Sequence, residues 1–216
     1  MTKNSEWGAV AYLTQSKYGR NGTEVTVNNV SLNEVNHVRA ATGFGASSIS
    51  AGTQITTWDK IENGTQAGSW TTSQGQLATT TGNIYGIYDL SGGVWERTAG
   101  FISETTGNYV TYGGELKGEV DKYRSKYAGT SATDTENYLV SPNPIRVGEA
   151  IWETSNSGTD SNSWNGDCSF FPFSSSPFFA RGGDWGYGAR AGLFAFHRTT
   201  GHCYFSNGFR AVLVAE

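Results

Sequence analysis

The side chains with the greatest chemical potential lie in the last part of the chain, between Ala180 and Glu216. Large aromatic side chains, which offer contact area with few rotatable bonds, are mixed there with side chains that form hydrogen bonds. Surfaces that bind ligands, such as antibody paratopes, use the same mixture. We predict that the following residues contact a ligand: Asp184, Trp185, Gly186, Tyr187, Arg190, Ala195, His197, Arg198, Thr199, Thr200, His202, Cys203, Tyr204, Phe205, Ser206 and Asn207.

Residues that could carry out catalysis are sparse. The sequence has no HExxH zinc motif, no phosphate-binding loop and no nucleophile elbow. His197 and His202 could chelate a metal together with Cys203, but no acid is placed to orient them, and chance composition explains the cluster better. Glu149 and Glu153 have helical spacing and are expected to be solvated. We therefore expect a binding protein, not an enzyme, with no catalytic residue.

Two short, regular segments, which we call the frames, enclose residues 184–207, which we call the insert. They are residues 181–183, Arg-Gly-Gly, and Gly208–Val214. Between them the side chains follow neither the 3.6-residue period of a helix nor the alternation of a strand. The two glycines of the first frame allow backbone conformations closed to other residues. In the second frame Phe209, Val212 and Val214 are expected to point into the core.

One part of the insert, the stretch that ends at His197, alternates like a strand. Phe194 and Phe196 are then expected to face the core, while Ala195 and His197 share the outward face. Trp185 is also a candidate for the core beneath the loops.

Composition limits the class of protein. The chain has 216 residues, 29 of them Gly, with only 16% charged residues, so we expect one domain in which helix is the minority. A net charge of -4 without a basic stripe argues against nucleic acid as a partner. No apolar stretch approaches the roughly 18 residues of a membrane span, and the first residues lack signal-peptide regions. Cys168 and Cys203 are expected to be free thiols.

Other elements are predicted from local patterns. The apolar run Trp7–Leu13 fits either a buried strand or a short helix. Glu24–Val27 is predicted to be a strand, and the capping-box spacing of Ser31 and Glu34 predicts a short helix that carries Val35 and Val38. We expect residues 46–81 to form a long loop and residues 148–153 a short helix.

Two passages resemble a known family. Residues 85–97, YGIYDLSGGVWER, look like the YGLYDMxGNVWEW block of the formylglycine-generating-enzyme type of C-type-lectin-like fold. Residues 181–185, RGGDW, followed by residues 208–210, GFR, resemble the RGGSW…GFR ending of the same family. The resemblance implies a single α+β domain over residues 1–216 with a C-type-lectin-like fold, poor in helix and rich in loops.

Within that fold, the insert is similar to the variable proteins of diversity-generating retroelements. In those proteins a reverse transcriptase randomises adenines in the final codons, and an AAY codon for Asn can then become Tyr, His, Asp, Ser, Thr, Gly, Arg, Cys or Phe. The resemblance implies that residues 180–216 form a variable ligand-binding segment and a closing strand. Outward loop side chains tolerate such exchange at a cost commonly within about 0.5 kcal/mol.

The same resemblance implies a protein or glycan ligand on a cell surface. It also implies an extracellular location, with display on a bacterial surface or a phage virion, and no required cofactor. The identity of the ligand and the oligomeric state stay open.

The sequence also departs from the family. The sulfatase-modifying enzymes of this fold bind copper through a cysteine pair near the C-terminus, and here only Cys203 lies in that region. Gly93 and Arg97 replace the second Asn and the last Trp of the block. The alternatives are an enzyme of the formylglycine-generating type that lacks the copper thiols, and a fixed adhesin or pilus-tip domain.

A structural calcium ion is a further implication of the resemblance. The family's calcium ligands match Asp89, Gly92, Val94 and Glu96, and hard oxygen ligands around a glycine turn suit Ca²⁺. In the alternative, which we favour, Asp89 makes a turn hydrogen bond and Glu96 forms a salt bridge with an arginine.

Overall fold

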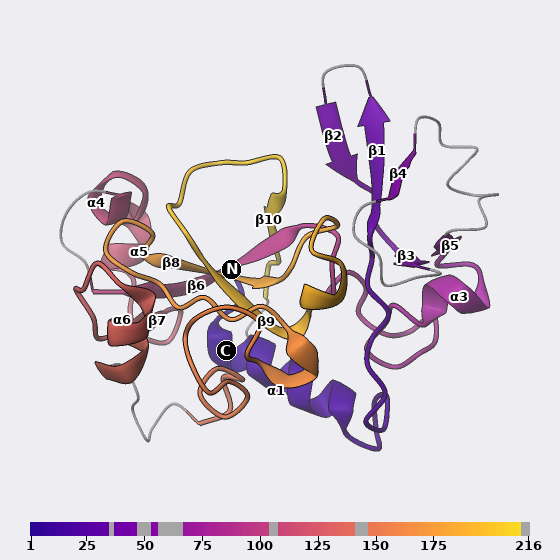
Figure 1. Ribbon diagram of the computed structural model, residues 1–216, viewed down its shortest axis with the longest axis horizontal. Coiled ribbons are helices and arrows are strands. Elements are labelled where there is room, and N and C mark those ends of the chain that lie inside the picture. Colours follow the sequence, from indigo (N-terminus) through magenta and orange to yellow (C-terminus); the bar gives the residue numbers. More distant parts are fainter. Residues whose placement is uncertain (35–36, 47–52, 56–66, 104–107, 141–146, 213–216) are drawn as a thin grey trace.

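A computed structural model describes residues 1–34, 37–46, 53–55, 67–103, 108–140 and 147–212 (Figure 1). The fold is of the α+β class, as predicted, with three sheets and short helices. The helices are α1 (Asn4–Gln15), α3 (Ser73–Gln76), α4 (Asn108–Tyr112), α5 (Gly114–Gly118) and α6 (Asp134–Val140), with 3₁₀ turns η2 (Trp164–Gly166) and η3 (Gly188–Arg190). The strands are β1 (Val30–Glu34), β2 (His37–Ala40), β3 (Phe44–Ala46), β4 (Thr53–Ile55), β5 (Ala67–Ser69), β6 (Trp95–Ile102), β7 (Ser125–Tyr127), β8 (Phe178–Gly182), β9 (Gly192–Thr199) and β10 (Asn207–Phe209).

The central sheet has the strand order β10-β6-β8-β9, with β7 also paired to β6. Strand β6 runs parallel to β10 and β7 and antiparallel to β8, which is antiparallel to β9. Glu96 lies opposite Arg181 on one side and opposite Gly208 on the other. The three sequence motifs, far apart in the chain, therefore meet in one sheet. The smaller sheets β2-β1-β4 and β3-β5 lie together with α3 at the right of Figure 1.

The first apolar run is a helix, which settles the ambiguity of the sequence. Trp7 and Ala11 are buried on the face of α1 that contacts β6 and β9. The indole Nε1 of Trp7 donates to the carbonyl oxygen of Leu193 on β9 at 2.7 Å. The Glu6 carboxylate accepts from the backbone N–H of Lys3 at 2.8 Å, which satisfies a donor at the start of the helix.

Arg181 is the most unusual core residue, because its side chain is completely buried. Its guanidinium donates to the carbonyl oxygens of Glu149 and Ala150 at 3.1 and 3.0 Å and lies 5.7 Å from the ring of Trp7. Burial lowers the pKa of Arg181 to about 10, which leaves it charged at neutral pH. The first frame of the insert is thus fixed to a distant turn from inside the core.

Two local predictions for the first forty residues were wrong. Glu24–Val27 is outside any strand, although Val25 and Val27 are buried. No helix begins at Ser31, because this buried residue pairs with Ala40 in the β1–β2 hairpin, where it cannot act as a cap. The side chains of Val35 and Val38 lie outside the described residues.

Residues 148–153 also form turns and no helix, since Gly148 and Ala150 have φ values of +97° and +54°. This turn presents the two carbonyls that Arg181 binds. The long loop expected over residues 46–81 contains β4, β5 and α3 in its described part.

Candidate ligand-binding surface

The insert forms two loops on either side of β9. Residues 183–191 join β8 to β9, and residues 200–206 join β9 to β10. The exposed positions are Gly186, His202, Cys203, Tyr204 and Phe205. The half-buried positions are Asp184, Trp185, Tyr187, Arg190, His197, Arg198, Thr199, Thr200, Ser206 and Asn207. Of the sixteen residues predicted to contact a ligand, the structure therefore places fifteen at least partly at the surface.

Ala195 is the exception, and this prediction is wrong. The alternation of the strand is as expected, but the face that Ala195 shares with His197 is covered, and Ala195 packs with Trp95, Cys168 and Ala180. Phe194 and Phe196 are fully buried on the opposite face, as predicted.

The expected inward orientation of the second frame is also wrong. Phe209 and Val212 are exposed, with 69% and 42% of their surfaces accessible, and Val214 lies outside the described residues. The neighbouring Gly208 is half-buried, and an added Cβ there would meet a methyl group of Val94 at 2.9 Å. Because side chains alternate along a strand, Phe209 must point outward.

Arginine and aromatic side chains gather beside β9. The guanidinium of Arg198 lies 4.7 Å from the ring centroids of both Phe170 and Phe173, and that of Arg190 lies 5.7 Å from the ring of Tyr187. We call these five residues the arginine–aromatic patch. Phe170 and Phe173 lie outside the insert, and their contribution to this surface was not predicted from the sequence.

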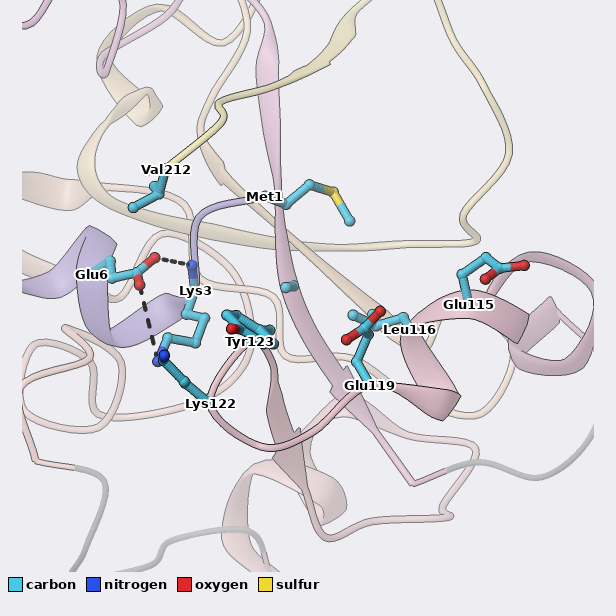
Figure 2. A pocket seen from close by; sticks show the side chains of 10 residues that line it. Met1, Lys3, Glu6, Glu115, Leu116, Glu119, Lys122, Tyr123 and Val212 are labelled. Carbon is cyan, nitrogen blue, oxygen red and sulfur yellow. Dashed lines mark hydrogen bonds and ion pairs between the residues drawn. The ribbon is translucent and has the colours of Figure 1, made fainter. Parts of the chain in front are cut away.

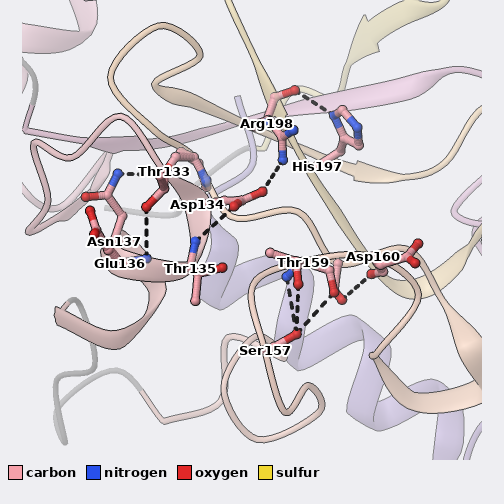
Figure 3. A network of polar contacts seen from close by, with 12 residues as sticks. Thr133, Asp134, Thr135, Glu136, Asn137, Ser157, Thr159, Asp160, His197 and Arg198 are labelled. Carbon is pink, nitrogen blue, oxygen red and sulfur yellow. Dashed lines mark hydrogen bonds and ion pairs between the residues drawn. The ribbon is translucent and has the colours of Figure 1, made fainter.

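Acidic residues from two other segments complete the patch. Asp134 on α6 pairs with Arg198 at 2.5 Å, and Asp160 pairs with Arg190 at 3.1 Å. Figure 3 shows Asp134 facing Arg198, with His197 on the far side of that arginine. Nothing in the sequence marks these two aspartates, because their roles depend on contacts across the fold.

His197 lies against three aromatic rings. The centroid of its imidazole is 5.1 Å from those of Trp95 and Phe170 and 6.2 Å from that of Tyr187. Burial lowers the pKa of His197 to about 4, so the ring is neutral at pH 7. Its Nδ1 lies 2.6 Å from the carbonyl oxygen of Arg198, which identifies Nδ1 as the protonated nitrogen. His197 is a packed part of the surface, and this geometry gives it no role as a metal ligand together with His202.

The second loop is attached to the sheet through its backbone. Arg97 on β6 donates to the carbonyl oxygens of Gly201, at 2.5 Å, and His202. The backbone N–H of Trp95 donates to the carbonyl oxygen of Ser206 at 2.8 Å. Tyr204 and Phe205, between these attachments, are 61% and 68% exposed.

The two carboxylates proposed as calcium ligands, those of Asp89 and Glu96, are already engaged by donors. Both oxygens of Asp89 accept from the backbone N–H of Gly43, at 3.1 and 3.0 Å, and one also accepts from Asn28. Both oxygens of Glu96 contact the guanidinium of Arg210 at 2.5 and 2.6 Å. The salt bridge expected in the alternative is confirmed, and Asp89 bonds across the chain instead of within its own turn. A guanidinium beside these carboxylates does not fit a calcium ion, so the donor set argues against the calcium prediction.

A hollow of about 450 Å³ lies on another part of the surface, between the start of the chain and α5 (Figure 2). Glu115 and Glu119 line it together with Lys122. Lys3 and Glu6 also border it, but they pair with each other at the start of α1. None of the predicted ligand-contacting residues lines this hollow.

No family model matches the sequence, and no curated protein matches it at a significant level. Among the described residues, no helix is long and apolar enough to cross a membrane.

Proposed function

We propose that this chain is a ligand-binding protein with a C-type-lectin-like fold of the formylglycine-generating-enzyme type, whose insert is diversified by a retroelement. The observation that carries the proposal is the contrast between the insert and its frames. The loops at residues 184–190 and 200–206 place side chains at the surface, while Arg181 of the first frame and Gly208 and Phe209 of the second pair with β6 in the central sheet.

The frames are held by groups that do not vary with the displayed side chains. Arg181 is bound to two backbone carbonyls inside the core, and Arg210 forms two contacts with the buried Glu96. The carbonyl oxygen of Arg210 also accepts from the backbone N–H of Thr2 at 3.1 Å. A scaffold tied in this way tolerates replacement of outward side chains between its attachment points.

The chemistry of the surface supports recognition of a protein or glycan on a cell surface. Tyr204 and Phe205 supply large exposed contact areas, and Arg190 and Arg198 supply donors that are stacked on aromatic rings. Such a ligand fits an extracellular protein displayed on a bacterial surface or a phage virion. The proposal needs no cofactor.

An enzyme of the copper-dependent kind has less support. Cys168 is completely buried, and burial raises the pKa of its thiol to about 12, whereas Cys203 is exposed on the second loop. Both cysteines are free, as predicted. A buried protonated thiol and an exposed one do not form a thiolate pair for a metal.

The direct test is to sequence this locus in many sibling isolates, together with the flanking DNA. We expect a nearby reverse transcriptase gene and a template repeat, with substitutions at codons for exposed insert residues such as His202, Tyr204 and Phe205. Tyr18 and Tyr85 are matched control positions, because they are 77% and 88% exposed but lie outside the insert. Equal variation at the controls would show that exposure alone explains the pattern and would overturn the proposal.

A further inference from the structure

Arg97 occupies a position where the resembled family block has a Trp, and neither frame includes it. It lies on β6 opposite Ala180 of β8, and its guanidinium reaches the carbonyl oxygens of Gly201 and His202. These two bonds join the middle strand of the sheet to the start of the second loop, more than a hundred positions later in the chain. Hydrogen bonds from a charged donor are among the stronger ones in proteins.

Two further polar attachments of this loop use its backbone. The carbonyl oxygen of Ser206 accepts from the backbone N–H of Trp95, and that of Tyr204 accepts from the N–H of Asn207 at 3.1 Å. Neither bond involves a displayed side chain. Among its side chains, His202 lies with its ring centroid 5.8 Å from that of Tyr112, and Ser206 forms a hydrogen bond with the carboxyl group of Asp184.

Gly201 is required at the point where Arg97 binds. Its φ is +93°, a conformation that other residues rarely adopt. A Cβ at this position would lie 2.7 Å from the Cβ of Tyr112 and 2.8 Å from the ring of Phe178. The loop can therefore bring its carbonyls to Arg97 only with glycine at position 201.

We infer that Arg97 is a positioning residue, which together with Gly201 fixes the backbone path of residues 200–206 whatever side chains the loop displays. The role of this arrangement in ligand binding rests on the proposed function, but the arrangement itself does not. Because the bonds are made to carbonyl groups, a change of side chain at residues 202–205 leaves them in place.

Limited proteolysis with chymotrypsin tests this inference without a ligand. The protease cleaves after exposed aromatic residues, and cleavage after Phe205 requires the loop to leave its attached conformation. We expect Arg97→Met to raise the initial rate of this cleavage about tenfold, since two charge-assisted hydrogen bonds are lost, and Arg97→Lys to give an intermediate rate. The cleavage site is identified by mass spectrometry, and urea denaturation reports global stability.

The matched control is Arg124→Met. Arg124 likewise donates to two consecutive carbonyl oxygens, those of Leu116 and Lys117, but both belong to α5, outside the insert. It should leave the rate after Phe205 unchanged. The double variant His202→Ser with Cys203→Ser should also keep the wild-type rate.

The inference is overturned if Arg97→Met and Arg97→Lys leave the cleavage rate unchanged, or if the double serine variant accelerates it as much as Arg97→Met. If Arg97→Met also lowers the urea midpoint, Arg97→Lys is the deciding variant. Faster cleavage after Phe205 at a wild-type urea midpoint supports the inference, and a wild-type cleavage rate overturns it. These outcomes are separate from the proposed function, which depends on the pattern of variation among isolates.

Discussion

His197 combines a surface position with a neutral side chain. It lies among the rings of Trp95, Phe170 and Tyr187, and the guanidinium groups of Arg190 and Arg198 also disfavour a second proton on it. Burial is the main cause of the lowered pKa. Protonation of this ring must therefore work against folding.

The pH dependence of stability follows from this shift. The pKa of His197 falls from 6.5 to about 4 on folding, so the unfolded chain binds more protons between these values. The contribution of His197 is present above pH 6.5 and is lost as the pH falls towards 4. We expect His197→Gln to lose about 2 kcal/mol less unfolding free energy than the reference between pH 7 and pH 4.5.

The reference for this measurement is His202→Gln, which removes an exposed imidazole and leaves the same number of histidines. Urea denaturation at a series of pH values gives both curves. Parallel curves for the two variants would contradict the assignment of a buried neutral ring to His197. Burial also raises the pKa values of the carboxyl groups of Asp89, Glu96 and Asp167, so only the difference between the variants is diagnostic.

At the level of elements, β9 begins at a residue with tight surroundings, Gly192. The carboxyl group of Asp167 is fully buried, and its Oδ2 accepts from the backbone N–H of Phe194 at 2.9 Å. Burial raises the pKa of Asp167 well above its usual range. A Cβ on Gly192 would lie 2.2 Å from both oxygens of this group, so β9 can begin here only with glycine.

Gly192→Ala should therefore lower the free energy of unfolding by about 3 kcal/mol, because either Asp167 or the strand has to move. Gly114→Ala is the matched control, since a Cβ there meets no atom within 4 Å and the residue begins α5. We expect the control to stay within about 0.5 kcal/mol of wild type. Thermal and urea denaturation measure both variants, and an equal effect of the two would contradict the steric argument.

The sequence predicted correctly those features that depend on residues close together in the chain, such as the alternation of side chains along β9. The alternation up to His197 correctly placed Phe194 and Phe196 in the core, and the α+β class followed from the family resemblance. The capping-box spacing at Ser31 failed because pairing with Ala40 buries that residue, and tertiary pairing overrides a local signal. The prediction that Phe209 points into the core was wrong, because the sequence does not show which face of a single edge strand is covered.

The candidate ligand-binding surface could be predicted only in part, because local sequence shows its loops but not the residues that contact them. Irregular residue types marked the insert, and nearly all of its selected positions reach the surface. The partners that hold it, Arg97, Asp134 and Asp160, come from separate segments, and only the fold brings them to the loops. The prediction that Ala195 lies at the surface was wrong because Trp95 and Cys168 cover its face of β9, and the sequence of one strand does not show which residues cover it.

For the whole molecule, the two thiols report surface accessibility and global opening separately. Cys203 is exposed and Cys168 is completely buried. With a coloured thiol reagent at pH 8, we expect one equivalent to react rapidly in the native protein and the second only in denaturant. Cys203→Ser should abolish the rapid phase alone. A rapid reaction of both thiols without denaturant would contradict the packing around Cys168.

The pairing of β10 with β6 also affects how the protein is made. Glu96 is synthesised 114 positions before Arg210, the residue whose guanidinium balances its buried charge. A stop codon anywhere in the insert removes both β10 and Arg210 and leaves that carboxylate uncompensated, a defect that typically costs about 3–5 kcal/mol. Only chains that are translated across the entire insert can therefore close the central sheet.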